Sequence, residues 1–140
     1  MEKTMKTMIP VPFRRRFAAV LPAVLCAAAA AAAAEPLDVT LSFDDGTKDH
    51  FTGAAPELEK RGWKGCFNLV TGKIGQKGYM TWDDVRELKK RGHEIASHTH
   101  THPDLVKLVA DGKADEAFAD LVRSRKEIER ELGERPRFLC

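Results

Sequence analysis

Apolar and polar residues alternate over 37–43 (LDVTLSF), which is the two-residue period of a β-strand. The run ends at two aspartates and a glycine, residues 44–46, and the glycine allows a sharp turn. A short helix is predicted over 53–61, followed by a second strand over 65–70. This part of the chain is therefore expected to form a strand–helix–strand unit.

The next helix has the clearest end signals. Thr81 is a good N-cap, acidic residues occupy the first turn, basic residues crowd the last turn, and Gly92 follows directly. Trp82, Val85 and Leu88 recur at helical spacing, so we expect them to face the core.

Two more strands and a longer helix complete the pattern. A short strand is predicted over 94–97, a helix over 113–132, and the start of a fourth strand over 136–140. Apolar residues recur along that helix at three- and four-residue intervals: Ala114, Ala117, Phe118, Leu121, Ile128 and Leu132. The alternating order of strands and helices is typical of an α/β fold with a parallel sheet and crossover helices.

Residues 1–34 predict a secretory signal peptide. Basic side chains lead, an uncharged stretch follows over 17–34, and three small residues, 32–34, precede Glu35. The alternative is a retained membrane anchor, because the 18 uncharged residues over 17–34 nearly reach the length of about 20 apolar residues that a membrane span needs. The alanine-rich stretch and its proline favour cleavage, so we expect an exported protein in the periplasm, in the cell envelope or secreted.

The net positive charge of the chain comes from this leader. Without residues 1–34, 18 of the 23 basic and 20 of the 21 acidic side chains remain. A nearly neutral body gives no electrostatic footprint for nucleic acid, and no stable membrane partner is expected after cleavage. Cys66 lies in an apolar run and is expected to be a buried small hydrophobe, not part of a disulfide framework.

Candidate metal ligands follow two of the predicted strands. Asp44 and Asp45 end the first strand, and three histidines, His98, His100 and His102, follow the third. Functional groups gather at the carboxyl ends of parallel strands, and imidazole with carboxylate suits zinc-like ions. His98 and His102 share a face whether the backbone is extended or helical, so they are the expected ligands and His100 an outer residue. One aspartate would complete the ligand set and the other would be free to act as a base.

These segments resemble a known family. SFDDG, residues 42–46, is similar to the TFDDG motif of the polysaccharide deacetylases, the carbohydrate esterases with a NodB-like domain. GHEIASHTHTHP, residues 92–103, resembles the family's second motif, H-[ST]-x-x-H, and the stretch from Thr81 is similar too. The resemblance covers residues 37–140 and implies an incomplete (β/α) barrel of the polysaccharide deacetylase type, about its first four strands.

The resemblance also implies roles for single residues. Asp44 would be the general base, and Asp45 would bind a divalent metal together with His98 and His102. Thr99 would orient its neighbours. The metal would be Zn²⁺, with Co²⁺, Mn²⁺ or Ni²⁺ also compatible with these ligands. The implied reaction is hydrolysis of N-acetyl groups from a chitin-like or peptidoglycan-like polysaccharide, releasing acetate.

Later motifs of that family are absent. The arginine-proline segment that braces the base, the tryptophan-bearing substrate wall and the histidine that protonates the leaving amine are not found. Residues 35–140 are therefore expected to be the N-terminal part of a deacetylase domain, truncated at its C-terminus. Because an open sheet exposes an edge, we expect this part alone to fold poorly and to have little activity.

Two other functions remain open from the sequence. The same site would serve an O-deacetylase of acetylated glycans such as xylan. A non-catalytic carbohydrate-binding or metal-binding remnant would bind metal without releasing acetate.

Overall fold

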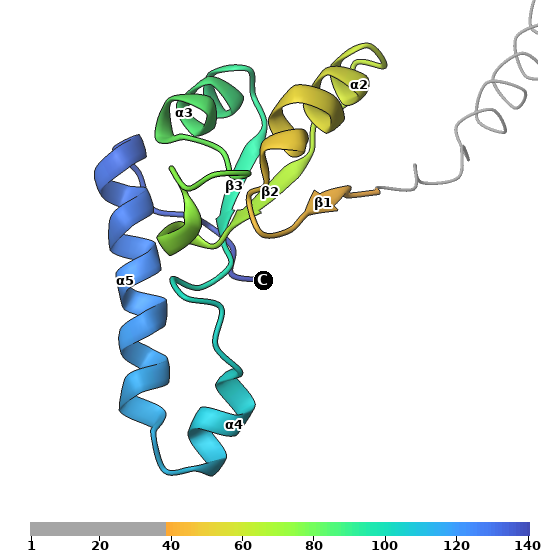
Figure 1. Ribbon diagram of the computed structural model, residues 1–140. Helices are drawn as coiled ribbons and strands as arrows, with labels where there is room; N and C mark the ends of the chain where they lie inside the picture. The colour runs from red at the N-terminus through yellow and green to blue at the C-terminus, as the bar shows by residue number, and fades with distance from the viewer. Residues whose placement is uncertain (1–38) are drawn as a thin grey trace, which may run out of the picture. The chain divides into compact units, whose positions relative to one another are not determined.

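The computed structural model describes residues 39–140, which contain a parallel sheet of three short strands (Figure 1). The strands are β1 (Ser42–Phe43), β2 (Cys66–Leu69) and β3 (Glu94–Ser97). β2 is central, and its Phe67 pairs with Phe43 of β1 and with Ile95 of β3. Both pairings are parallel, so the predicted α/β architecture with parallel strands is confirmed.

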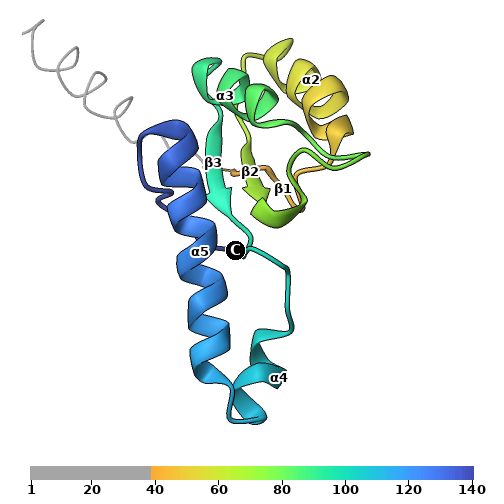
Figure 2. The same ribbon diagram turned by 60° about the vertical axis from the view of Figure 1, so that its left-hand side comes forward.

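Helices connect and cover the strands. They are η1, a π-helical turn (His50–Ala54), α2 (Ala55–Glu59), η2, a 3₁₀ turn (Thr71–Lys73), α3 (Trp82–Lys90), α4 (Leu105–Ala110) and α5 (Ala114–Leu132). Figures 1 and 2 show α2 and α3 near each other, α5 running beside β3, and α4 at the far end of α5, away from the sheet.

The core is built around Phe67. Its side chain is fully buried, its ring stacks on that of Phe43 at 5.1 Å between centroids, and the ring of His93 meets it edge-on at 5.2 Å. The other buried apolar members of this core are Ala55, Leu58, Leu69, Met80, Val85, Leu88, Ile95 and Ile128. All four residues of β2 are buried, as expected for a central parallel strand covered on both faces.

The end signals predicted for α3 are confirmed. The N–H of Asp84 donates to the hydroxyl of Thr81 at 3.2 Å, and the carboxylate of Asp84 accepts from the N–H of Thr81 at 2.7 Å. This reciprocal capping box satisfies two main-chain donors that the helix leaves free. At the other end, Gly92 has φ +87°, the left-handed conformation that ends the helix.

The helix predicted over 53–61 begins earlier and is not a regular α-helix. η1 starts at His50, and the N–H of Ala55 donates to the carbonyl of His50, five residues back. Pro56 has no N–H for the carbonyl of Thr52, and its ring crowds that carbonyl in a regular helix. The wider π-turn before Pro56 removes this conflict.

Two other expectations needed correction, and one helix had not been predicted. Within the described residues, the strand predicted over 37–43 is reduced to β1, because β2 begins at Cys66 and offers no partner to Val39. The segment 136–140 approaches β3 through the single parallel bridge Ser97↔Leu139 and not as a strand. α4 was not predicted, although Asp104 caps it by accepting from the N–H of Lys107 at 2.8 Å.

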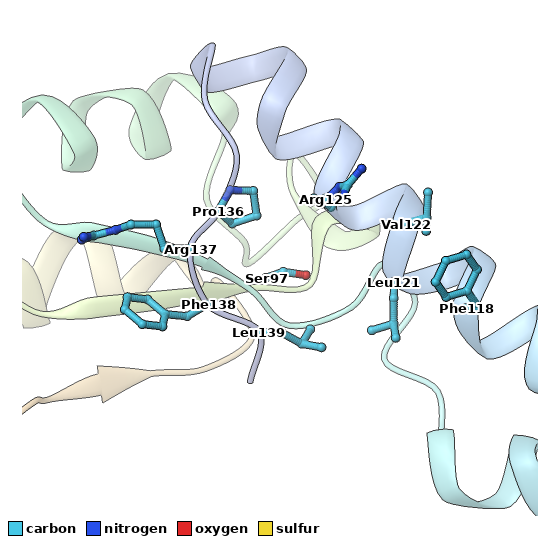
Figure 3. Close-up of a pocket in the computed structure, with 9 residues that line it drawn as sticks. All are labelled: Ser97, Phe118, Leu121, Val122, Arg125, Pro136, Arg137, Phe138 and Leu139. Carbon is cyan, nitrogen blue, oxygen red and sulfur yellow. The ribbon is translucent and has the colours of Figure 1, made fainter.

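The predicted buried face of α5 is only partly correct. Ala117 and Ile128 are buried, whereas Ala114 is exposed and Phe118 is 68% exposed. Figure 3 shows Phe118 beside a groove of about 340 Å³ between α5 and the segment 136–139. The apolar stripe of α5 is therefore wider than the surface that the described residues place against it.

The leader predicted over 1–34 lies outside the described residues. Between residues 39 and 140, no helix combines the length and the apolar character needed to cross a bilayer. The two cysteines of this part, Cys66 and Cys140, are both free, and Cys66 is buried as predicted.

Two phenylalanines provide a matched test of the core. Phe67→Ala should lower the free energy of unfolding by about 3–5 kcal/mol, because it removes a fully buried ring from a packed site. Phe118→Ala should lower it by no more than about 0.5 kcal/mol, because that ring is mostly exposed. Urea unfolding followed by circular dichroism measures both changes, and equal losses would contradict this assignment of the core.

Candidate metal centre

The first candidate ligand stands on a tight turn after β1. Asp45 has φ +76° and Gly46 has φ +80°, so two successive residues adopt the left-handed conformation. Aspartate tolerates this region better than most side chains. A Cβ at Gly46 would lie 3.0 Å from Ile74 and 3.2 Å from Leu69, so this turn also packs closely against the end of β2. The turn directs the chain sharply away from the sheet at Asp45.

The other candidate ligands lie on residues 98–102, here called the histidine turn. Thr99 has φ +66° and His102 has φ +60°, and with Asp45 they are the non-glycine residues with positive φ in the described part of the chain. The hydroxyl of Thr99 accepts from the N–H of His102 at 2.9 Å and closes the turn. As a result, the rings of His98 and His102 lie 4.7 Å apart between centroids.

The two turns meet at the carboxyl edge of the sheet. Nε2 of His98 lies 3.1 Å from Nε2 of His102 and 4.0 Å from Oδ1 of Asp45. One donor atom from each of the three residues lies within 4.8 Å of the others. The structure thus brings together Asp45, His98 and His102, here called the His–His–Asp cluster. Asp45 and His98 are partly buried and His102 is exposed, so the cluster is open to solvent on one side.

The donor set fits a divalent ion. Zinc binds imidazole nitrogen and carboxylate oxygen at about 2.0–2.2 Å, so its ligand atoms lie about 3 Å or slightly more apart. Nδ1 of His98 is 2.8 Å from the main-chain oxygen of Cys140. Because that oxygen only accepts, Nδ1 carries the proton and the lone pair is left on Nε2, which faces the cluster. This is the outer hydrogen bond that metal-binding histidines usually make.

Asp44 is adjacent to the cluster in sequence but has a different partner. Its Oδ1 accepts a hydrogen bond of 2.6 Å from Nδ2 of Asn68 in β2. Asn68 is itself buried, and its side-chain oxygen accepts from the thiol of Cys66 at 3.3 Å. Burial raises the pKa of the Cys66 thiol, so it stays protonated and can donate. Asn68 was not predicted, although a polar residue within the buried strand sequence CFNL is its signal.

His100 faces away from the cluster. Its Nδ1 lies 2.9 Å from the hydroxyl of Thr71 and 3.0 Å from Oε2 of Glu127 on α5. Burial alone would raise the pKa of Glu127, but hydrogen bonding from Thr71 and the nearby charges of His100 and Arg123 outweigh it, so its pKa is lowered. The expected outer position of His100 agrees with this contact.

The carboxylate of Asp120 on α5 binds main-chain N–H groups of the histidine turn. It accepts from the N–H of His100 at 2.6 Å and from the hydroxyl of Thr101 at 2.6 Å. Burial would raise the pKa of Asp120, but these bonds from Thr101 and from the main chain outweigh it and lower the pKa. Neither Asp120 nor Glu127 was predicted from the sequence. Both are acidic residues of an amphipathic helix, and the helical pattern does not show which of its acidic side chains will contact a turn that is distant in the sequence.

Comparison with known proteins places this chain in a family. The family model described as polysaccharide deacetylase matches residues 32–140. The chitin deacetylase of Arthroderma benhamiae is 37% identical over 91 residues, which cover 60% of this chain and 24% of that protein. The peptidoglycan-N-acetylglucosamine deacetylase of Bacillus cereus is 28% identical over 103 residues, which cover 73% of this chain and 34% of that protein.

Solved structures agree with the fold. The structure of Streptococcus pyogenes deacetylase PplD in complex with acetate matches with a TM-score of 0.65 at 27% identity, over 72% of this chain and 44% of that one. The parallel sheet and its helices thus correspond to part of a deacetylase barrel, as expected from the sequence. This chain spans about a quarter to a third of the length of the curated relatives it matches. The match over residues 32–140 shows that the chain belongs to the polysaccharide deacetylase family.

Proposed function

We propose that this chain takes part in the metal-dependent hydrolysis of N-acetyl groups from an amino-sugar polysaccharide of the chitin or peptidoglycan type. The observation that carries the proposal is the convergence of Asp45, His98 and His102, with a second carboxylate, Asp44, beside them. The names of two relatives, a chitin deacetylase and a peptidoglycan-N-acetylglucosamine deacetylase, support this substrate class. The leader predicted over 1–34 supports action in the periplasm, in the cell envelope or outside the cell.

Asp45, His98 and His102 would hold the metal. When bound, a divalent ion, most simply Zn²⁺, supplies Lewis-acid polarisation of the acetamide carbonyl and acidifies the attacking water. The proton on Nδ1 of His98 fixes the orientation of that ring through the main-chain oxygen of Cys140. The exposed side at His102 leaves room for a polymeric substrate to approach.

Asp44 is the proposed base. Because Oδ1 is occupied by the amide of Asn68, Oδ2 is the oxygen left to take the proton of the attacking water. The water oxygen forms a bond to the acetyl carbon, the bond from that carbon to nitrogen breaks, and the leaving nitrogen takes up the proton that Asp44 removed from the water, which returns Asp44 to its carboxylate form. The products are acetate and a free amine on the sugar.

Substitution of the two aspartates separates their proposed roles. Asp45→Ala should abolish Zn²⁺ binding measured by calorimetry, because it removes one of three ligands. Asp44→Asn should keep the native metal affinity but lower acetate release by about 10²–10⁴-fold, because an amide cannot accept the proton. Release is measured from N-acetylglucosamine oligomers and peptidoglycan carrying isotope-labelled acetyl groups, so that slow turnover is detected.

The matched control is Asp49→Ala, which removes an exposed carboxylate from the same segment, outside the cluster. It should leave metal affinity and acetate release unchanged. Equal loss of metal in Asp44→Asn and Asp45→Ala would contradict the division of roles. Release from acetylated xylan but not from amino-sugar polymers would instead favour an O-deacetylase.

Metal removal tests the requirement for the ion directly. Dialysis against a chelator should abolish acetate release, because it removes the Lewis acid from the cluster. Addition of Zn²⁺ or Co²⁺ should restore acetate release, because a metal ion then returns to the cluster. His98→Ala should not recover under the same addition. Full turnover by the metal-free protein would refute the proposed mechanism.

A further inference from the structure

The histidine turn adopts a conformation that its own residues disfavour. Thr99 is β-branched and has φ +66°, a region in which such side chains are rare. His102, four residues after His98, also has positive φ. A backbone of this kind persists only where the surrounding structure holds it. The contacts that hold residues 98–102 therefore decide whether His98 and His102 face one another.

One set of contacts comes from η2, the 3₁₀ turn that follows β2. The N–H of Thr71 donates to the carbonyl of Thr99 at 3.2 Å, and the N–H of Gly72 donates to the carbonyl of His100 at 2.9 Å. These bonds hold the carbonyl side of the turn. They leave the N–H groups of His100 and Thr101, which lie on the opposite side of the peptide units, to be satisfied elsewhere.

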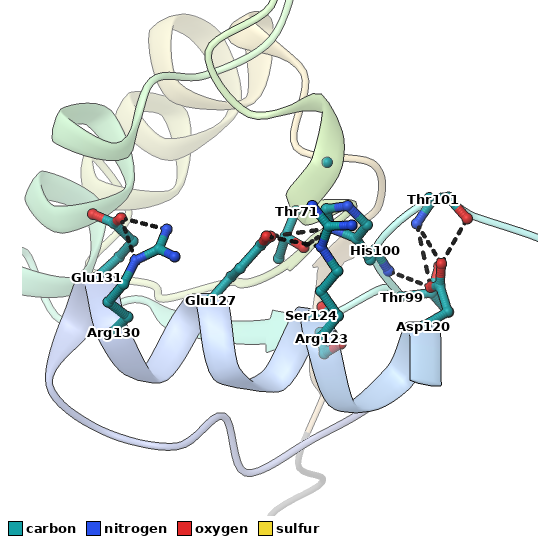
Figure 4. Close-up of polar contacts among 12 residues, drawn as sticks. Thr71, Thr99, His100, Thr101, Asp120, Arg123, Ser124, Glu127, Arg130 and Glu131 are labelled. Atoms are coloured by element: carbon teal, nitrogen blue, oxygen red, sulfur yellow. Dashed lines mark hydrogen bonds and ion pairs between the residues drawn. The ribbon is translucent and has the colours of Figure 1, made fainter. Parts of the chain in front are cut away.

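The second set comes from a single carboxylate on α5. Oδ1 of Asp120 accepts from the N–H of His100 at 2.6 Å, while Oδ2 accepts from the N–H of Thr101 at 3.1 Å and from its hydroxyl at 2.6 Å. Figure 4 shows Asp120 reaching from α5 to the turn, next to the contact between Glu127 and His100. The two residues between Thr99 and His102 are thus fixed to α5, while the side chain of Asp120 is not itself part of the His–His–Asp cluster.

We propose that Asp120 is a positioning residue for the metal centre: by binding the main chain of His100 and Thr101, it sets the separation of His98 and His102 and hence the affinity for the metal. This role rests on the proposed function, because it presumes that the His–His–Asp cluster binds a divalent ion. Asp120 acts through the turn and touches neither ligand. Its loss therefore weakens metal binding without removing a ligand.

The test uses Co²⁺ binding to the 140-residue chain, followed by visible absorption. Asp120→Asn keeps the size of the side chain but replaces one acceptor oxygen by a donor group. It should raise the dissociation constant for Co²⁺ by about 10–100-fold, the range seen when groups that orient metal ligands are lost. The absorption bands should also change position, since the ligand geometry changes. A purely structural role would lower the melting temperature of the metal-free protein and leave these bands in place.

Asp115→Asn is the matched control, because Asp115 is an exposed aspartate of the same helix that makes no hydrogen bond to the histidine turn in the described part of the chain. It should bind Co²⁺ as the native chain does. Thr101→Val removes only the hydroxyl donor to Asp120 and should weaken binding several-fold. The double variant Asp120→Asn/Thr101→Val should bind no more weakly than Asp120→Asn alone, because both changes break the same contact.

The outcomes separate this role from the function on which it rests. If Asp120→Asn has the far-ultraviolet circular dichroism of the native chain and binds Co²⁺ equally tightly, the positioning role is refuted. If Asp120→Asn does not fold, native affinity and native bands in Thr101→Val refute it instead. If the native chain binds Co²⁺ no better than His102→Ala, the proposed metal centre fails, and the positioning role fails with it.

Discussion

The parallel pairing of β2 with β3 ends at Leu69 and Ser97, but η2, directly after β2, stays bonded to the chain that follows β3, and the candidate site depends on this contact. Past Leu69 and Ser97, the N–H groups of Thr71 and Gly72 still donate to carbonyls of the histidine turn. The approach is so close that a Cβ at Gly72 would lie 2.7 Å from the carbonyl oxygen of His100. Only glycine allows this contact without a shift of the main chain. The short turn η2 thus supports a strained turn at the carboxyl edge of the sheet.

Among the described residues, the non-glycine residues with left-handed backbone lie at this edge of the sheet. Asp45, Thr99 and His102 are the non-glycine residues with positive φ among those described, and two of them belong to the His–His–Asp cluster. Each such residue costs roughly 1–3 kcal/mol. In the histidine turn, neighbouring contacts offset this cost: the bond from the N–H of His102 to the hydroxyl of Thr99, the bonds from η2 and those to Asp120 of α5. Strain and its support therefore lie together where the chemistry is proposed, as in many functional sites.

The sequence predicted those features that local patterns determine. The N-cap at Thr81, the bounds of β3 and the alternation of strands and helices as far as β3 follow from residues close together in the chain. That one of the two aspartates would meet His98 and His102 follows from one further rule, that the carboxyl ends of parallel strands share an edge. The choice of Asp45 came from the family resemblance, and the structure brings this residue together with the two histidines. The roles of Asp44, Asp45 and the two histidines in catalysis and metal binding stay predictions.

Features that depend on distant packing were missed or wrong. Asn68 contacts Asp44, and Asp120 and Glu127 contact the histidine turn, only because separate elements pack together. Helical spacing cannot tell a buried apolar position from an exposed one such as Phe118 when the covering surface is narrower than the stripe. The π-turn of η1 arises from the conflict between Pro56 and the preceding turn. For this reason the helical segment begins at His50, earlier than the predicted start at residue 53.

The alternating histidines show how one short segment can serve two purposes. In an extended strand, residues 98, 100 and 102 would all point to one face. The left-handed residues Thr99 and His102 break that alternation, so the ring of His100 turns toward Glu127 while those of His98 and His102 face each other. The proton positions follow the same division. Nδ1 of His100 donates to a carboxylate whose pKa is lowered, and Nδ1 of His98 donates to a main-chain oxygen. His100 thus fastens the turn to α5, and His98 keeps its Nε2 lone pair available to a metal ion.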